Sequence, residues 1–316
     1  MASKTFRILF VTDLHGSEKC WRKFLEVGNR FKVDCMIAAG DLTGKVIAPI
    51  IRIEENLHKC RIFGHEYELH NENEITIMEQ KIKDTGYYPY RCTVKRAEEL
   101  NENKKELDKL FDELMQESIK KWLDMTTDKI DKNVKLIVNP GNDDRFVVDH
   151  IIEEHEGVIY PLGKVVHLND KYEMVSCEWV NITPWNSPRE CSEEELMKKL
   201  EKEIGRLNNF ENAVFNFHAP PYDTSLDKAP KIGKDLKPVT MLGMPQTESV
   251  GSRSVRDVIK KYQPFMGLHG HIHESSGKQK IGRTVCLNPG SEYASGILRF
   301  LLIALNKKVE YWPREF

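Results

Sequence analysis

The sequence lacks several features that would place the protein in a specialised class. Its seven cysteines are odd in number and show no C-x-x-C spacing, which suits reduced thiols in a large cytosolic protein, so we expect no disulfide. Long apolar runs are also missing. The stretches Ile8 to Val11 and Leu298 to Leu305 are too short for a signal peptide or a membrane span. We therefore expect a cytoplasmic protein with no membrane partner.

The chain also lacks an excess of charge of either sign. Lysine and arginine total 47 against 49 acidic residues, a formal net charge of −2. Without a basic field, general nucleic-acid binding is not expected, and a small or local anionic substrate fits better. There is no internal repeat and no low-complexity tract. With 316 residues, 40% of them hydrophobic, the chain is long enough for one large globular domain with an accessory piece.

Side chains that commonly bind metals occur in a suggestive order. In two pairs, one residue separates the two candidate ligands. Side chains two positions apart in an extended segment lie on the same face, so each pair is predicted to hold one ion. Three single residues end apolar, strand-like runs, and in an open α/β sheet such strand ends form the ligand-binding edge. The pairs are Asp13 with His15 and His271 with His273, and the single residues are Asp41, Asn142 and His218.

Carboxylate, amide and imidazole donors suit manganese, iron, zinc, nickel or magnesium rather than the soft ions that thiolates select. At these residues the chain resembles the calcineurin-like metallophosphoesterase superfamily, whose motifs are D-x-H, G-D, G-N-x-D, a lone histidine and G-H-x-H. All five occur in the right order: Asp13-Leu14-His15, Gly40-Asp41, Gly141-Asn142-Asp143-Asp144, His218 and Gly270-His271-Ile272-His273.

The resemblance implies an α/β fold, a four-layer α/β/β/α sandwich with an inserted, mainly helical cap. It also implies a centre of two divalent ions, with manganese favoured, bridged by Asp41 and by a hydroxide that attacks a phosphate ester. One ion would be held by Asp13, His15, Asp41 and His273, and the other by Asp41, Asn142, His218 and His271.

An insertion separates the second motif from the third. We assign residues 1–44 and 135–316 to the metallophosphoesterase core and 45–134 to the cap, which should stand at the mouth of the site because both of its ends emerge beside ligands. Helices are predicted at residues 75–85 and 103–129, whereas residues 61–69 could instead form one arm of a small hairpin. A homo-oligomer would form through this cap. Residues 219–251 lack periodicity and are predicted to form a long loop that serves as a lid.

Asp143 departs from the family pattern, because many members have a histidine there that assists phosphate binding or protonates the leaving oxygen. A carboxylate at that place repels phosphate unless it is protonated or paired with a cation. Asp143 is therefore either a general acid with a raised pKa or a group that orients another ligand. We take Asn142 and Asp143 as candidate catalytic residues. Asp144 is expected to brace the loop, and His269 to pack in the core or support a ligand.

Family members that lack this histidine tend to be phosphodiesterases, so the favoured function is metal-dependent hydrolysis of a phosphodiester in a small or nucleotide-like substrate. One alternative is a nuclease of the same superfamily, which needs a groove for a strand. Another is a non-catalytic scaffold that uses the fold as a protein-binding surface. Such scaffolds usually lose ligands, whereas all seven ligand positions are filled here.

Overall fold

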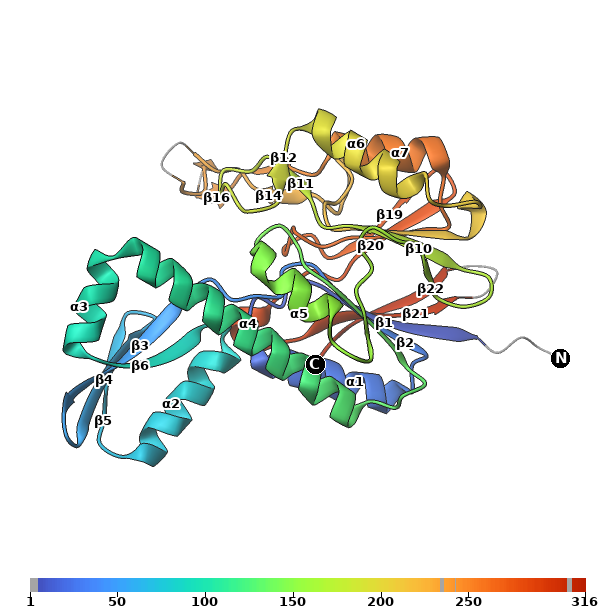
Figure 1. Cartoon of the computed structure of the whole chain (residues 1–316). Helices are drawn as coiled ribbons and strands as arrows, with labels where there is room; N and C mark the ends of the chain where they lie inside the picture. The colour runs from blue at the N-terminus through green and yellow to red at the C-terminus, as the bar shows by residue number, and fades with distance from the viewer. Residues whose placement is uncertain (1–4, 234–235, 242, 306–308) are drawn as a thin grey trace.

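The computed structural model describes residues 5–233, 236–241, 243–305 and 309–316. Its centre is a pair of six-stranded sheets, which confirms the mixed α/β class (Figure 1). The first sheet has the order β22 (Val309–Glu315), β21 (Arg299–Leu305), β1 (Phe6–Val11), β2 (Cys35–Ala39), β7 (Lys135–Asn139) and β8 (Val158–Ile159). The second has the order β19 (Gly277–Ile281), β20 (Thr284–Asn288), β18 (Met266–Leu268), β13 (Ala213–Phe217), β10 (Glu173–Cys177) and β9 (Val166–His167).

The central strands β2, β13 and β18 are buried along their whole length because both faces of each sheet are covered there. In β1, Ile8 and Phe10 belong to a buried cluster made of residues from both sheets, so they face the other sheet. Leu9 and Val11 alternate with them and join the cluster under the helices. The first sheet is covered on its outer face by α1 (Glu18–Phe31), α4 (Lys104–Lys129) and α5 (Asp149–Glu153), and the second by α6 (Glu193–Ile204) and α7 (Arg253–Tyr262).

The insertion contains a sheet that the sequence analysis did not include. Its strand order is β5 (His65–Leu69), β4 (Leu57–Ile62), β3 (Ile47–Glu54) and β6 (Tyr88–Thr93), with α2 (Glu72–Asp84) and α3 (Val94–Glu102) beside it. The helices expected at 75–85 and 103–129 are present, as α2 and α4. The predicted hairpin arm at 61–69 holds the turn between β4 and β5. Strands β3 and β6 pair in parallel across a long stretch of chain, a contact that local sequence pattern does not reveal.

Helix α4 joins the insertion to the core. Its second half supplies Met115, Ile119, Trp122 and Leu123 to the cluster that contains Trp21 of α1. This helix begins in the insertion and ends against the first sheet, so the insertion is anchored by packing as well as by its chain connections. The limits 45–134 for a cap subdomain stay a prediction.

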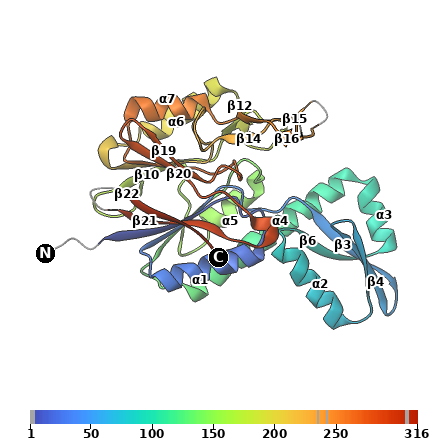
Figure 2. The ribbon, with the colours of Figure 1, turned by 180° about the vertical axis from the view of Figure 1, so that it is seen from behind.

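The segment after His218 is not an irregular loop, and that prediction is wrong for its central part. Strand β14 (Lys228–Pro230) pairs with β17 (Thr247–Ser249), and β15 (Thr240–Met241) with β16 (Met244–Pro245). These pairs form an arm on the same side of the molecule as the insertion (Figures 1 and 2). The strands are two or three residues long and largely exposed, so no alternation of apolar residues marks them. Residues 234, 235 and 242 of the predicted lid lie outside the described residues.

The remaining elements are short connections. They are β11 (Val180–Asn181), β12 (Glu190–Cys191) and the 3₁₀ turns η1 (Phe146–Val148), η2 (Phe210–Asn212) and η3 (Tyr293–Ser295). All seven cysteines are free thiols. Among the described residues, no helix combines the length and the apolar character that crossing a bilayer requires.

Candidate metal centre

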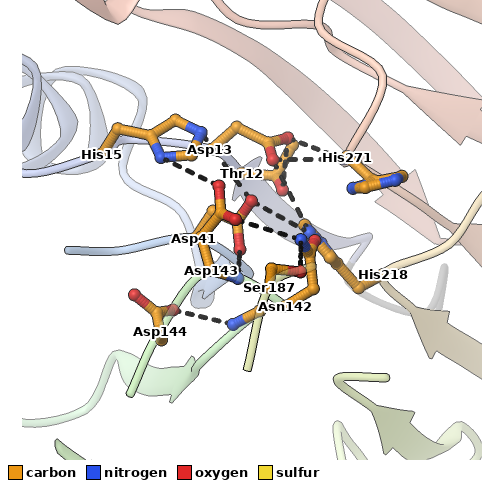
Figure 3. Close-up of polar contacts among 12 residues, drawn as sticks. Thr12, Asp13, His15, Asp41, Asn142, Asp143, Asp144, Ser187, His218 and His271 are labelled. Carbon is orange, nitrogen blue, oxygen red and sulfur yellow. Dashed lines mark hydrogen bonds and ion pairs between the residues drawn. The ribbon is translucent and has the colours of Figure 1, made fainter. Parts of the chain in front are cut away.

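The candidate ligands lie in loops that leave the carboxyl ends of five strands. Asp13 and His15 follow β1, Asp41 follows β2 and Asn142 follows β7, all in the first sheet, whereas His218 follows β13 and the pair His271 and His273 follows β18 in the second. The close-up shows side chains from both sheets turned toward one another (Figure 3). The structure therefore brings all seven candidate ligands to one place, where the ends of the two sheets meet.

The prediction that the two ligand pairs lie on extended segments is wrong. Asp13, His15, Asp41 and His271 have left-handed backbone conformations, with φ of 54°, 42°, 45° and 66°. This conformation costs an L-residue about 1–2 kcal/mol and is kept only where other contacts enforce it. Here the backbone N–H of Asp13 donates to Gly40 O at 3.0 Å, and that of His15 to Asp41 O at 2.8 Å. Backbone hydrogen bonds therefore join the loop after β1 to the loop after β2, and the candidate ligands of both loops face the centre.

Six of the seven candidate ligands fall into two groups, and a third group of possible ligand atoms, His15, Asp41 and Asp143, overlaps both. In the first, which holds Asp13, His15 and His273, and in the second, which holds Asp41, His218 and His271, the ligand atoms lie within 4.8 Å of one another. The pair Asp13 and His15 stays together, whereas the pair His271 and His273 is divided between the groups.

The distances have the scale of metal coordination. His15 Nε2 and His273 Nε2 are 3.0 Å apart, and two nitrogens bound at right angles to one ion at roughly 2.1 Å would be separated by roughly 3.0 Å. Asp41 Oδ2 lies 3.7 Å from His15 Nε2 and 3.5 Å from His218 Nε2. Asp41, a member of the second group, therefore also lies close to His15 of the first group.

Several buried atoms at the centre have no hydrogen-bond partner among the described residues: His15 Nδ1, Asn142 Oδ1, and Nδ1 and Nε2 of His218. Buried polar atoms without partners are rare and cost about 1–3 kcal/mol each. Asn142 Nδ2 donates to Ser187 Oγ at 2.8 Å, which fixes the amide. The unpaired amide oxygen of Asn142 and the imidazole nitrogens are ligand atoms of the type that bind Mn²⁺, Fe and Zn²⁺, so the residues fit a metal ion.

The pKa values of the four candidate histidines are shifted in opposite directions, down for His15 and His271 and up for His218 and His273. Burial lowers the pKa of His15 to about 3 and that of His271 to about 4, so both are neutral, as metal ligands must be. Burial opposes charge on His218 as well, but Asp41 raises the pKa of that imidazole to about 9. Despite its burial, Asp41 has a pKa well below the ordinary value, because His218 and His15 lie beside it. A bound cation would replace the proton on His218.

Two further residues hold the ligand loops in place. The carboxylate of Asp144 accepts hydrogen bonds from the backbone of Leu42, Thr43 and Gly141 at 2.8–2.9 Å and from Thr43 Oγ1 at 2.6 Å, so it ties the loop after β2 to the loop after β7. His269 is fully buried, and its Nδ1 lies 2.8 Å from Phe217 O and 3.0 Å from Ala219 O. These carbonyls flank His218, so His269 sets the backbone that presents this ligand.

Asp143 has a cation beside it that the sequence analysis missed. Its carboxylate forms an ion pair with Lys45, and its backbone N–H donates to Asp41 Oδ1 at 2.9 Å. Burial and the Asp41 charge nevertheless raise the pKa of Asp143 to about 7. In the sequence, the only indication that Lys45 lies near the centre is its position four residues after Asp41. Tyr293, also missed, places its ring 4.6 Å from that of His15.

The centre opens into a cavity of about 670 Å³. One wall is formed by Asp41, Lys45, Asn142 and Asp143 together with His271 and His273. Residues 181–185 and the arm that carries β14 and β17 also line the cavity. Candidate ligands and the Asp143–Lys45 pair therefore face a space large enough for a small organic phosphate.

Comparisons with known proteins identify one relative by sequence and several solved structures with a similar fold. No protein-family model matches the chain. The uncharacterized protein MJ1162 of Methanocaldococcus jannaschii is 31% identical over 159 residues, which are 49% of this chain and 64% of that protein. The match thus spans less than two thirds of the relative's length.

Solved structures resemble the chain over nearly its whole length. One crystal structure has a TM-score of 0.57 at 16% identity and covers 99% of this chain and 100% of its own. TT1561 of Thermus thermophilus has a TM-score of 0.50 at 12% identity, with 98% and 99% covered. A dimetal phosphatase from Danio rerio scores 0.44 at 8% identity, with 98% of each chain covered. The first two show the fold alone, and the third is too dissimilar to carry an argument.

Proposed function

We propose that this protein is a metal-dependent phosphoesterase that hydrolyses phosphodiesters of small or nucleotide-like substrates. The observation that carries the proposal is that the seven candidate ligands, which come from both sheets, converge on one place. Several of their buried nitrogen and oxygen atoms have no hydrogen-bond partner among the described residues. Asp13, His15, Asp41 and His273 would hold one divalent ion, and Asp41, Asn142, His218 and His271 the other. When bound, two such ions supply a water of lowered pKa and stabilise charge on phosphoryl oxygens.

The chain's own residues have distinct parts in this chemistry. The neutral imidazoles of His15 and His271 are ready to donate lone pairs. Asn142 Nδ2 donates to Ser187 Oγ, and its buried Oδ1, which has no hydrogen-bond partner among the described residues, would bind an ion. Asp143 meets both conditions that a carboxylate near phosphate needs, because its pKa is raised to about 7 and Lys45 lies beside it. In its protonated form, the Asp143 carboxyl can give a proton to the leaving oxygen.

The phosphodiester preference rests on Asp143 in place of the histidine that the resemblance leads one to expect. Manganese is the favoured ion, and cytoplasmic location and assembly through the cap complete the proposal. A nuclease would need to lay a strand along the cavity, and a scaffold would need no ions.

The proposal is tested by turnover after reconstitution with Mn²⁺. The protein should hydrolyse bis(p-nitrophenyl) phosphate faster than p-nitrophenyl phosphate, and Asp41→Asn should lower kcat/KM by at least about 100-fold, because the shared ligand is lost. Single-stranded and duplex DNA are included in the same assay. Hydrolysis of DNA alone would favour the nuclease, and no hydrolysis with any metal would favour the scaffold.

A further inference from the structure

The cavity beside the metal centre carries an exposed indole. Trp185 lines it with 59% of its surface exposed, and Ile182, three residues earlier, is 69% exposed. Large apolar side chains held open to water in a cavity wall commonly mark a binding surface. Trp185 has no role in the metal chemistry proposed above, so its exposure calls for another explanation.

The loop that carries Trp185 is held by hydrogen bonds to one partly buried carboxylate, that of Glu190. Glu190 accepts hydrogen bonds from Thr183 N and Ser187 N, both at 2.8 Å, and from Thr183 Oγ1 and Ser187 Oγ, both at 2.6 Å. The backbone N–H of Trp185 donates to Thr183 Oγ1 at 3.1 Å. Although burial opposes it, these bonds from Ser187 and Thr183 lower the pKa of Glu190 below its ordinary value. The indole thus stands on a rigid loop, which reduces the entropy lost when a ligand packs on it.

The same network reaches the metal centre. Ser187, which donates to Glu190, also accepts the hydrogen bond from Asn142 Nδ2 at 2.8 Å. Only one residue lies between Ser187 and Trp185. The backbone that carries the indole is therefore held by the same hydrogen bonds that orient a candidate ligand, so a group stacked on Trp185 would lie beside the centre.

The cavity lining combines aliphatic residues such as Ile232 and Val250 with polar and aromatic ones. The guanidinium of Arg253 lies over the ring of Tyr222, 4.6 Å from its centroid, and both residues line the cavity. Asn181 also lines it, and its buried Oδ1 lacks a hydrogen-bond partner among the described residues. An acyl chain would leave these polar groups unsatisfied. A nucleoside offers a flat aromatic face together with hydrogen-bonding edges and hydroxyls, which matches this wall.

We propose that this cavity binds the nucleoside part of a nucleoside phosphodiester, with the base stacked on the indole of Trp185 and the phosphate at the metal centre. This inference rests on the proposed phosphodiesterase function and narrows its substrate class. Stacking of one base on an aromatic side chain changes affinity by roughly 5- to 150-fold.

The test compares two diesters with the same leaving group in the manganese-loaded, full-length protein. Thymidine 5′-(p-nitrophenyl) phosphate carries a nucleoside, and methyl p-nitrophenyl phosphate does not. We expect kcat/KM to favour the thymidine ester by about tenfold or more. In Trp185→Ala this preference should shrink to within about threefold, while Trp185→Phe should keep most of it. Trp312→Ala, which removes an exposed indole on β22 outside the cavity, is the control and should leave the preference unchanged.

Binding of thymidine 5′-monophosphate provides a readout that does not depend on hydrolysis. It should quench part of the tryptophan fluorescence of the wild type and of Trp312→Ala in a saturable way, and that of Trp185→Ala should not respond. Failure of the wild type to cleave either ester would refute the phosphodiesterase, and the fluorescence titration would then decide the nucleoside site alone. Equal turnover of both esters by the wild type, or equal loss on both in Trp185→Ala, would overturn the inference.

Discussion

At the scale of single residues, the pairing of Asp143 with Lys45 distinguishes this centre. Lys45 comes from the first residues of the insertion and forms an ion pair with a carboxylate at the cavity wall. A carboxylate there would repel a phosphate, and the ammonium group offsets that charge. Through Lys45, the insertion would therefore contribute a positive charge to the proposed phosphate-binding site, in addition to its effect on the shape of the molecule.

Replacing Lys45 should weaken phosphodiester turnover. In Lys45→Met a cationic donor to phosphate is lost, so kcat/KM should fall by about 10- to 100-fold, although the pKa of Asp143 would rise further without the neighbouring ammonium group. Lys95→Met removes a highly exposed lysine from α3 and serves as the control. Steady-state kinetics with a p-nitrophenyl diester measure both variants. A Lys45→Met value within twofold of the wild type would show that the ammonium group does not act on substrate.

At the scale of elements, α7 depends on a carboxylate from the neighbouring helix. Glu193 of α6 accepts hydrogen bonds from Arg253 N and Ser254 N, at 2.8 and 2.9 Å, and from Ser252 Oγ at 2.8 Å. Negative charge at a helix N-terminus is stabilising because the first N–H groups have no partner within the helix. Glu193 thus fixes α7 to α6 above the second sheet.

Glu193→Gln should lower the free energy of unfolding by about 1–2 kcal/mol near neutral pH. Burial raises the pKa of Glu193, but the bonds from Ser254 and Arg253 outweigh it and hold that pKa below the ordinary value. The stabilisation is therefore present above the unfolded pKa of about 4.3 and is lost as the pH falls through the folded pKa. Urea unfolding should show the difference from the wild type shrinking below about pH 4. Glu194→Gln, an exposed neighbour, is the control, and a pH-independent difference would contradict the account.

The packing of helix α4 against the core includes a stacked pair of indoles. Trp122 is 1% exposed, and its ring stacks on that of Trp21, with centroids 4.9 Å apart and planes inclined by 17°. Trp122→Ala should lower the free energy of unfolding by about 3–5 kcal/mol because it opens a cavity under the first sheet. Glu117→Ala, on the exposed side of α4, should change it little. A loss below about 1 kcal/mol for Trp122→Ala in urea unfolding would mean that α4 is not integral to the core.

At the scale of the whole molecule, the candidate centre joins the two sheets. Asp13, His15, Asp41 and Asn142 come from the first, and His218, His271 and His273 from the second. Ions bound to this set would cross-link both halves of the fold. A ligand that binds only the folded state stabilises it by about 2.7 kcal/mol at a concentration 100 times its Kd.

Metal should therefore raise the thermal unfolding midpoint, and a chelator should lower it. The increment should vanish in Asp41→Asn, because the shared carboxylate is lost. Differential scanning calorimetry with and without Mn²⁺ measures it. Acidification should remove the same increment, since protons compete for the histidines, and excess Mn²⁺ should restore part of it. An equal increment in Asp41→Asn and in the wild type would place the bound metal elsewhere.

The sequence indicated the candidate ligands because each lies in a short motif at a strand end, where residue type and spacing are local. It predicted α2 and α4 for the same reason. It did not reveal Lys45, Ser187 or Trp185, because their proximity to the centre depends on how loops fold back across the sheets. The left-handed backbone at Asp13 and His271 was also hidden, since neither residue is a glycine. The sheet of the insertion depends on pairing between distant segments.

The most direct test of the central claim is anomalous X-ray diffraction from crystals of the Mn²⁺-loaded protein. The account predicts two peaks about 3.5–4 Å apart, one on each side of the Asp41 carboxylate. The first should lie among Asp13, His15 and His273, and the second among Asn142, His218 and His271. Anomalous peaks only at other places in the molecule, or none at full loading, would contradict the account.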